Sequence, residues 1–395
     1  MSKPPRPGDL LRVGFNARLL VDPRVRGWNR YTVDLLRELP AHGVFPILYT
    51  HAALSDAYLR LFPAGGFAVE VAPTMNYLAW LLKWVPGRCR ADRLDLFHSP
   101  FNFGLPPTTP CPRVLTLHDA IDVAYRPAGS DRPKVEGPGR WSTAGIKSAI
   151  DHKLSRARAD RIITVSEHAK ADIVRWFRAD PARVAVTPEA ADPVFHAPVG
   201  GEARARVRAR YDLPPRYIFY VGGWEGRKNV PFLVRAFARA NVDGLSLAIA
   251  GGGDSQRAEL VAQAESLGIG DRLRPIGWVE DEDLAALYAE ATGFVYPSVY
   301  EGFGLQLCEA MAVGCPTFAS RATSLPEVLG DGGETFALDD PAELAGLIRR
   351  VADDPEYRAR LSDRARRRSL DYSWSRTAAA TVRVYRDLLE SRSAS

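Results

Sequence analysis

The chain has 395 residues, 46% of them hydrophobic and 25% charged, and its 52 basic against 47 acidic side chains give a net charge of +5. These values are typical of globular proteins and exclude a disordered chain, a collagen-like repeat and a small disulfide scaffold. The length predicts two domains, and the mild positive excess does not by itself indicate nucleic-acid binding. Only seven of the basic residues are lysines, so a lysine inside a motif stands out.

The four cysteines lack the spacing of a metal or redox site, which favours a reducing, cytoplasmic compartment. No apolar stretch of signal-peptide length follows the proline-rich start. The longest lipid-like segment, residues 77–85, is too short to cross a bilayer. Its Trp80 and Trp84 favour a helix packed on the core, with contact to a membrane surface as the alternative.

Strand-like apolar runs alternate with helical patterns along the chain. In the first half, strands are predicted at 11–15, 45–49, 67–72, 94–98, 113–118, 161–166 and 184–187, and helices at 31–39, about 145–158 and 168–178. In the second half, strands are predicted at 217–221, 245–250, 272–276, 293–296 and 316–319, and helices at 230–240, 258–267, 282–290 and about 305–313. Such alternation predicts an α/β fold with a mostly parallel sheet in each half.

The proline-containing segment 195–215 separates the two halves. We therefore predict two Rossmann-like domains, residues 1–195 and 196–374. Ligands of open α/β sheets bind beyond the carboxyl ends of the strands, so a ligand is expected in a cleft between two facing domains. The C-terminal part is rich in arginine, including Arg364, Arg366 and Arg368. These arginines favour a solvated helix face, with a lipid-contacting patch as the alternative.

The strongest signal is a glycine-bracketed turn that runs from a predicted strand into a helix beginning near Leu305. Gly302 and Gly304 allow the backbone to approach a ligand closely, and the free amides of a helix start favour an anion. Two carboxylates flank this turn, Glu301 before the helix and Glu309 inside it. Since a carboxylate repels phosphate, we expect the two to accept hydrogen bonds from hydroxyl groups, a sugar at one end of the ligand and a ribose at the other.

A second signal follows the first strand of the second half, where Arg227 and Lys228 stand at a helix start. Cations are unfavourable at that end of the helix dipole, so an anionic ligand that compensates them is indicated. A surface pair of cations is the alternative. In the first half, His118 ends a buried strand and is either a ligand-facing or merely a packed histidine. No HExxH, P-loop or GxSxG motif is found, and no Asp-x-Asp metal clamp follows a strand. The acidic run Asp281-Glu282-Asp283 is better explained by Asp281 as the N-terminal cap of the next helix, and no required metal is expected.

Together these segments resemble the retaining, metal-independent glycosyltransferases of the GT-B fold, family 4, from about Val13 to Leu389. The pair Glu301 and Glu309 is similar to the family's E-x7-E element, and Arg227-Lys228-Asn229 to its basic donor-phosphate element. His118 is similar to its cleft histidine. Further family-like phrases stand at residues 97–100, 161–167, 276–279 and 372–374.

The resemblance implies a C-terminal helix, about residues 375–392, that packs back onto the first domain. It implies transfer of a hexosyl unit, of mannosyl or rhamnosyl type, from a GDP-, UDP- or dTDP-sugar to an acceptor hydroxyl with retained configuration. The acceptor would be a carbohydrate, a lipid-linked sugar or a small molecule, as in polysaccharide, glycolipid or natural-product biosynthesis. No cofactor and no nucleic acid is expected, and peripheral contact with the inner membrane face is compatible with a lipid-linked acceptor.

The resemblance also assigns roles to residues of this chain. The catalytic residues would be His118, Glu301, Arg227 and Lys228. The donor-binding residues would be Gly223, Val279, Gly302, Phe303, Gly304, Leu305 and Glu309. The acceptor-side residues would be Gly27, Trp28, Asn29, Arg30 and Tyr31, with the 126–145 loop and its Trp141 nearby. The chain departs from the family pattern at Trp28 and Asn29, and at Gly223, where many members have arginine; phosphate binding would then depend more on Arg227 and Lys228.

Two alternative functions are also compatible with the sequence. One is a GT-B nucleotide-sugar epimerase, hydrolase or phosphorylase, and the other is a non-catalytic nucleotide-sugar-binding subunit. The joint presence of the two glutamates, the two cations and the histidine argues against a silent subunit. The absence of GxGxxG disfavours a dehydrogenase.

Overall fold

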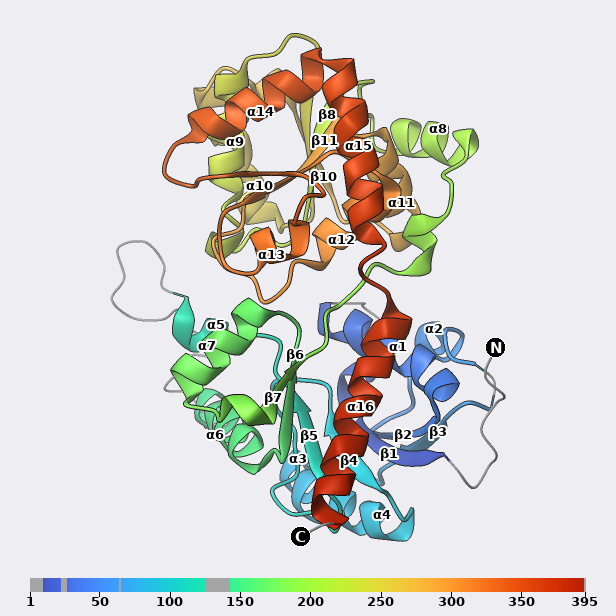
Figure 1. Ribbon diagram of the computed structural model, residues 1–395. Helices are drawn as coiled ribbons and strands as arrows, with labels where there is room; N and C mark the ends of the chain where they lie inside the picture. The colour runs from blue at the N-terminus through green and yellow to red at the C-terminus, as the bar shows by residue number, and fades with distance from the viewer. Residues whose placement is uncertain (1–9, 23–26, 64, 126–142, 394–395) are drawn as a thin grey trace. The chain divides into compact units, whose positions relative to one another are not determined.

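The computed structural model describes residues 10–22, 27–63, 65–125 and 143–393 (Figure 1). The chain forms two compact units, and each is described by itself. Unit 1 takes the described residues up to Ala124, those from 143 to Glu189 and those from Ser373 onward, whereas unit 2 takes Ala190–Tyr372 together with Tyr125. The divisions predicted from the sequence lie at 195/196 and 374/375.

The core of unit 1 is a parallel sheet of seven strands in the order β3-β2-β1-β4-β5-β6-β7. The strands are β1 (Leu11–Asn16), β2 (Val44–Thr50), β3 (Ala68–Val71), β4 (Leu96–Ser99), β5 (Arg113–Thr116), β6 (Arg161–Thr164) and β7 (Val184–Val186). The helices are α1 (Gly27–Glu38), α2 (Asp56–Leu59), α3 (Tyr77–Ala79), α4 (Val85–Ala91), α5 (Ile121–Ala124), α6 (Thr143–Arg158), α7 (Glu167–Phe177) and α16 (Trp374–Ser393). In this strand order β1 lies inside the sheet, β2 and β3 follow it on one side, and β4 to β7 follow it on the other, as in Rossmann-like sheets.

Unit 2 is built on a six-stranded parallel sheet in the order β10-β9-β8-β11-β12-β13. Its strands are β8 (Tyr217–Val221), β9 (Ser246–Ala250), β10 (Leu273–Gly277), β11 (Gly293–Tyr296), β12 (Thr317–Ser320) and β13 (Glu334–Phe336). Its helices are α8 (Gly201–Arg210), α9 (Val230–Ala240), α10 (Asp254–Ser266), α11 (Asp281–Glu290), α12 (Leu305–Val313), α13 (Leu325–Leu329), α14 (Pro341–Asp353) and α15 (Pro355–Ser369). The predicted α/β fold with parallel sheets is confirmed.

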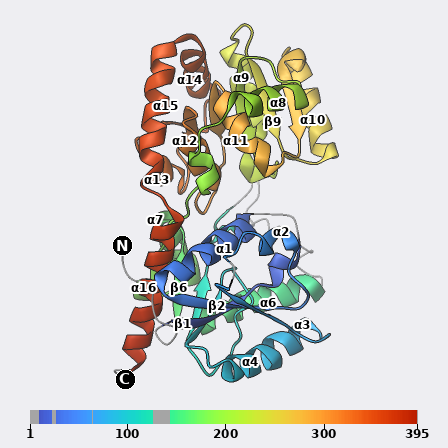
Figure 2. The same ribbon diagram turned by 90° about the vertical axis from the view of Figure 1, so that its right-hand side faces the viewer.

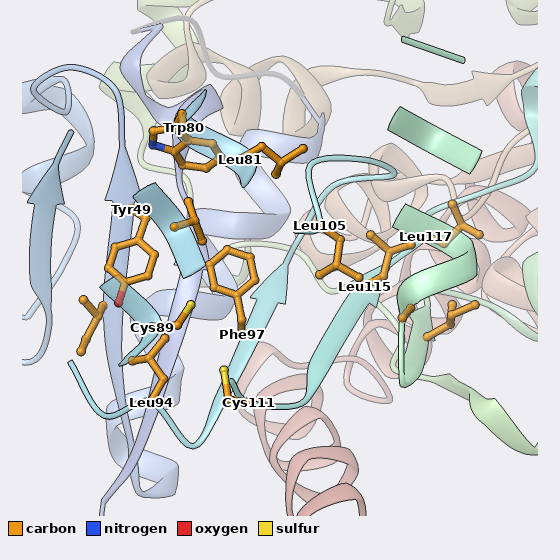
Figure 3. Close-up of a cluster of buried hydrophobic side chains, with 14 of the residues drawn as sticks. Tyr49, Trp80, Leu81, Cys89, Leu94, Phe97, Leu105, Cys111, Leu115 and Leu117 are labelled. Atoms are coloured by element: carbon orange, nitrogen blue, oxygen red, sulfur yellow. The ribbon is translucent and has the colours of Figure 1, made fainter. Parts of the chain in front are cut away.

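A cluster of buried side chains fills one face of the unit 1 sheet (Figure 3). Trp80 is fully buried in it, and Trp84 packs against it. Between α3 and α4 the backbone makes a π-helical turn, Trp80–Trp84, which still directs both indoles toward the sheet. The aromatic residues of segment 77–85 thus belong to the core. No helix in the described part of the chain is long and apolar enough to span a membrane.

The helix α16 completes unit 1 from the far end of the sequence. Its Tyr385 hydroxyl lies 2.6 Å from Nδ1 of His98 on β4, and Nε2 of that imidazole lies 2.8 Å from Thr116 Oγ1. Burial, with some help from the nearby His118, lowers the pKa of His98 to about 3, so the ring is neutral at physiological pH. A neutral imidazole between two hydroxyls satisfies all of its hydrogen-bonding capacity inside the core.

The first helix is longer than the predicted helix 31–39. Helix α1 begins at Gly27 rather than near Tyr31, so the predicted acceptor-side turn forms its first turns. Glycine and asparagine disfavour helix interiors, and this is why the pattern favoured a loop. Tertiary contacts compensate, because Asn29 Nδ2 donates to the carbonyl oxygen of Leu19 at 3.2 Å and to the hydroxyl of Tyr58 at 3.1 Å.

The prediction for the arginine-rich segment on α15 is corrected as well, because its arginines do more than form a solvated helix face. Arg366 Nη2 donates to the carbonyl oxygen of Val313 at the end of α12, at 3.2 Å. Arg368 donates to two carbonyl oxygens of α13, those of Glu327 at 2.7 Å and Val328 at 3.2 Å. The last carbonyls of a helix have no partner within it, and a cation is favoured at that end of the dipole. The guanidinium groups therefore act as caps of neighbouring helices.

We predict that Arg368→Ala lowers the free energy of unfolding by about 2 kcal/mol, because two carbonyls lose a charged donor. For a unit of this size, that corresponds to a fall of several degrees in the midpoint of thermal unfolding. The matched control is Arg367→Ala, which removes the exposed arginine next to it. Equal midpoints for the two variants in differential scanning fluorimetry would contradict the capping role.

Candidate active site

In unit 2, two segments carrying charged side chains meet because their strands are neighbours. Strand β8 pairs in parallel with β11, so the segments that follow them leave the same edge of the sheet. After β8 the chain makes a 3-10 turn, Gly226–Lys228, and after β11 it reaches Glu301 and the start of α12. Val299 N donates to the carbonyl oxygen of Arg227 at 2.7 Å and ties the two segments together.

A compact charge cluster results. Glu301 Oε1 lies 2.7 Å from Lys228 Nζ and 3.0 Å from Arg227 Nη1. The lysine is only 7% exposed, and its ammonium also donates to the Tyr296 hydroxyl at 2.7 Å. Tyr296 in turn donates to Gln306 Oε1 at 2.9 Å. The structure thus brings together three of the four predicted catalytic residues on a buried, hydrogen-bonded support.

The electrostatics of the cluster follow from burial and mutual attraction. Burial lowers the pKa of Lys228, although Glu301 opposes that shift. Burial alone would raise the pKa of Glu301, but the charges of Lys228 and Arg227 outweigh it and hold the pKa of the carboxyl below its usual value. Two cations thus share the carboxylate of Glu301, and the carboxylate of Glu225 also acts on Lys228.

The turn before α12 is held by side chains from the segment after β12. Thr323 Oγ1 accepts from Glu301 N at 3.0 Å, and Ser324 Oγ lies 3.0 Å from the carbonyl oxygens of both Glu301 and Phe303. Gly304 has φ +102°, and a Cβ there would clash with Leu325 Cδ2. Only glycine suits that position, which fixes the approach of the chain to the helix start.

The other predicted donor residues occupy the same unit. Glu309 is buried on α12 and accepts a hydrogen bond from Tyr288 Oη at 3.1 Å. Val279 follows β10 and is half-buried. The remaining donor-side residues are half-buried Gly223 and Gly302, and buried Phe303, Gly304 and Leu305. The carboxylate of Glu225 occupies the space that a Cβ at residue 223 would need, which is a local reason for glycine there.

In unit 1, His118 is buried just beyond β5. Its Nε2 lies 3.0 Å from the Pro100 carbonyl oxygen, and its Nδ1 lies 3.4 Å from Glu189 Oε1. The ring stacks on Trp28 with centroids 6.1 Å apart and meets Tyr31 edge-on at 4.7 Å. The histidine is therefore oriented by partners on both nitrogens and by two rings of α1.

The predicted acceptor-side residues divide by exposure. Gly27 is exposed, Trp28 and Arg30 are half-buried, and Asn29 and Tyr31 are buried. The Tyr31 hydroxyl lies 3.3 Å from Thr116 Oγ1, and burial raises its pKa well above the usual value. Asn29 and Tyr31 thus stabilise the fold beneath the helix start. Trp141 and most of the 126–145 loop lie outside the described residues.

Sequence reasoning missed several supporting residues. Glu189 follows the predicted strand 184–187 within a Pro-Glu pair, and it lies three residues beyond the end of β7, much as His118 lies two residues beyond the end of β5. Tyr296 ends a predicted strand just before the glutamate turn. Thr323 and Ser324 precede a Leu-Pro-Glu sequence, which is a signal for a helix start. Strand ends could have indicated the first two, whereas their pairing partners depend on the tertiary fold.

Comparisons with known proteins agree with this geometry. Residues 203–368 match the family described as glycosyl transferases group 1, and residues 25–195 match glycosyltransferase family 4. The chain is 37% identical over 233 residues to the MMP alpha-(1->4)-mannosyltransferase of Mycolicibacterium hassiacum, spanning 57% of this chain and 53% of that protein. It is 31% identical over 298 residues to the O-antigen chain mannosyltransferase B of Escherichia coli, spanning 74% of each chain.

Among solved structures, Anabaena HepE in complex with UDP and glucose aligns over 98% of this chain and 100% of its own, with a TM-score of 0.70 and 17% identity. The two parallel-sheet units are thus those of a glycosyltransferase with the GT-B fold. The chain belongs to glycosyltransferase family 4, within the group 1 glycosyl transferases.

We predict that Glu301→Gln lowers the free energy of unfolding at neutral pH by about 3–5 kcal/mol, because two cations lose their buried counter-charge. The folded-state pKa of Glu301 is lowered, so its stabilisation is present above the ordinary carboxyl pKa of about 4.3 and is lost as pH falls through the lowered value. The difference between wild type and variant in thermal midpoint should shrink on acidification.

The control for this series is Glu356→Gln. Its carboxylate is 92% exposed and lies 3.9 Å from Arg360, so the substitution should change the midpoint little at any pH. A difference between Glu301→Gln and wild type that stays constant down to acidic pH would rule out the ion pair as its cause.

Proposed function

We propose that this glycosyltransferase moves a hexosyl unit, of mannosyl or rhamnosyl type, from a nucleotide-sugar to an acceptor hydroxyl with retention and without a metal. The observation that carries the proposal is the buried cluster of Lys228, Arg227 and Glu301 at the carboxyl edge of the unit 2 sheet. The names of two relatives, both mannosyltransferases, support the sugar type. The UDP bound by HepE supports a nucleotide-sugar donor.

The chemistry needs stabilisation of the leaving diphosphate. An ammonium has three N–H donors, and Lys228 uses two of them within the described residues, on Tyr296 and Glu301. The third is suited to a phosphate oxygen, and Arg227 adds a second cation beside it. Charge that develops on the diphosphate is then met by groups already in place, which is the most effective form of electrostatic catalysis.

The start of α12 supplies the second part of the donor site. The amides of Gly302 to Leu305 and the helix dipole favour phosphate, and the carboxylate of Glu301 accepts hydrogen bonds from sugar hydroxyls. Glu309 would hold the ribose. In the described residues no three His, Cys, Asp or Glu side chains are grouped to bind a metal ion; the two cations take the charge-neutralising role in this proposal.

The acceptor would bind unit 1, near Trp28 and Arg30 at the start of α1. His118 would exchange its 3.4 Å contact with Glu189 for a sugar hydroxyl, keep its contact with Pro100, and shield the reacting carbon from water. Such a transfer would serve the biosynthesis of a polysaccharide, a glycolipid or a natural product in the cytoplasm. The four cysteines, all of them described, are buried and form no disulfide, which is compatible with a reducing compartment.

We predict that Lys228→Met lowers kcat for sugar transfer by about 10²- to 10³-fold, because the leaving diphosphate loses a preorganised donor. Glu301 keeps Arg227 as partner, so the thermal midpoint should fall far less than in Glu301→Gln. The control Lys170→Met removes a lysine on α7 of unit 1. Unchanged turnover by Lys228→Met would refute the phosphate role.

We also predict that the product keeps the donor's anomeric configuration and that EDTA leaves the rate unchanged. Proton NMR of the product gives the configuration, and rates with and without EDTA give the metal dependence. Thermal shifts with GDP, UDP and dTDP-sugars identify the base, since a ligand that binds the folded state raises the midpoint. Inverted product, or activity restored by Mg²⁺ after EDTA, would refute the mechanism; sugar release without acceptor at the full rate would instead indicate a hydrolase.

A further inference from the structure

A groove of about 760 Å³ lies in unit 1 between the segment that contains α3 and helix α6, two elements that lie beside each other in Figure 2. Its walls are apolar. Leu78 and Leu82 come from the first segment, and Ile150 and Leu154 come from α6. Each pair is spaced four residues apart, so each presents one face of a helical turn to the groove.

These four aliphatic side chains are unusually accessible. Their exposed fractions are 54% for Leu78, 46% for Leu82, 52% for Ile150 and 42% for Leu154. Single exposed leucines are common, but a continuous apolar hollow on a surface indicates a site of contact. The same segment buries Trp80 in the core, and among the described residues of the unit nothing covers its exposed Leu78 and Leu82.

The floor of the groove is rigid. The Tyr77 hydroxyl donates to Asp151 Oδ2 at 2.5 Å, and Gly104 N donates to Asp151 Oδ1 at 3.2 Å. Ser155 Oγ, one turn further along α6, accepts from Leu105 N at 3.1 Å. One carboxylate oxygen of Asp151 thus joins the two walls through Tyr77, and the other ties α6 to the loop at Gly104. These contacts form within the protein without a ligand.

The two segments that form the groove are rich in basic residues, of which Lys147 lines the groove and Arg88 is paired with Glu70 and Asp92. Residues 77–91 and 143–158 together contain seven basic side chains and one acid, Asp151, in a chain whose net charge is only +5. Three of the chain's seven lysines are among them, namely Lys83, Lys147 and Lys153. All three are exposed, and no ion pair is found for them in the described part of the chain.

Exposed aliphatic side chains together with basic residues are typical of protein surfaces that bind membranes. Apolar side chains at the centre insert at the boundary between headgroups and acyl chains, while lysines around them reach the phosphates with their long stems. Each lysine near an anionic leaflet adds an independent attraction. We propose that this groove docks unit 1 on a bilayer rich in anionic phospholipid. Its apolar part is Leu78, Leu82, Ile150 and Leu154, and Lys147 belongs to its lining. The exposed Lys83 and Lys153 stand on the same two segments.

The groove is linked to the acceptor side of unit 1 by aromatic contacts. Phe103 lines the groove, and its ring centroid lies 6.2 Å from that of Trp28, which stacks on His118. A bilayer docked here brings lipid headgroups close to these residues. The consequence that the acceptor is lipid-linked rests on the proposed function, whereas docking itself does not.

The test is vesicle co-sedimentation of the full-length protein with equimolar phosphatidylcholine and phosphatidylglycerol. The variant Leu82→Ser/Lys147→Glu removes one leucine and reverses one cation in the groove. The matched control, Arg60→Glu/Leu61→Ser, makes the same chemical change at another exposed site of unit 1, where Leu61 is 43% exposed. Thermal midpoints of both variants check that they are folded.

We expect wild type and control to bind the vesicles, and the groove variant to bind about tenfold less. Binding should weaken in pure phosphatidylcholine and in high salt. No binding by the wild type, or equal loss in control and groove variant, would overturn the proposal. A dimer in light scattering that the groove variant abolishes, without vesicle binding, would assign the face to a second copy instead. None of these readouts requires sugar transfer, so failure here leaves the proposed function standing.

Discussion

The contact between Lys228 and Glu301 is the constraint around which unit 2 is organised. An ammonium that is 7% exposed remains charged only when an anion stands beside it, because burial alone favours the neutral amine. That anion comes from the segment after β11, so β8 and β11 must be adjacent and parallel for their carboxyl ends to meet. The sheet order, the turn at Gly304 and the hydrogen bonds of Thr323 and Ser324 all serve to hold the two segments together.

The local sequence pattern was sufficient to predict most strands of the two sheets. It was insufficient wherever the conformation of a segment depends on contacts with residues distant in the sequence. The strands 217–221 and 293–296 were predictable because buried parallel strands are continuous apolar runs between turn residues. The short strand β13, Glu334–Phe336, has no such run. Gly27 and Asn29 read as a loop because the contacts of Asn29 with Leu19 and Tyr58 cannot be seen from neighbouring residues.

The same distinction applies to the candidate site. The Arg227-Lys228 pair and the two glutamates were found from spacing and from their places at strand ends. Their ionic contacts were not, because a distance between residues 228 and 301 depends on which strands are neighbours. Glu189 was missed for the same reason, since its meeting with His118 joins segments far apart in the sequence.

Arginine and lysine have different places in this protein. Arg366 and Arg368 direct planar donors at helix-end carbonyls, a task that needs a fixed fork of N–H groups. Lysine appears where a compact charge is needed at one point, as at Lys228, or where a long flexible stem reaches into solvent, as around the groove of unit 1. The few lysines of this chain are therefore not interchangeable with its helix-capping arginines.

The helix α16 also affects how the protein is made. Its Tyr385 closes the hydrogen bonding of His98, and its Trp374 ring lies 5.8 Å from that of Tyr31 on α1. A ribosome delivers these residues only after the whole of unit 2 has been synthesised. The strands of unit 1 are therefore synthesised first, but their buried contacts with Tyr385 and Trp374 can form only after α16 has been synthesised. Unit 2, which is continuous from Ala190 to Tyr372, has all its elements before unit 1 does, so the second unit in the sequence is the first that can mature.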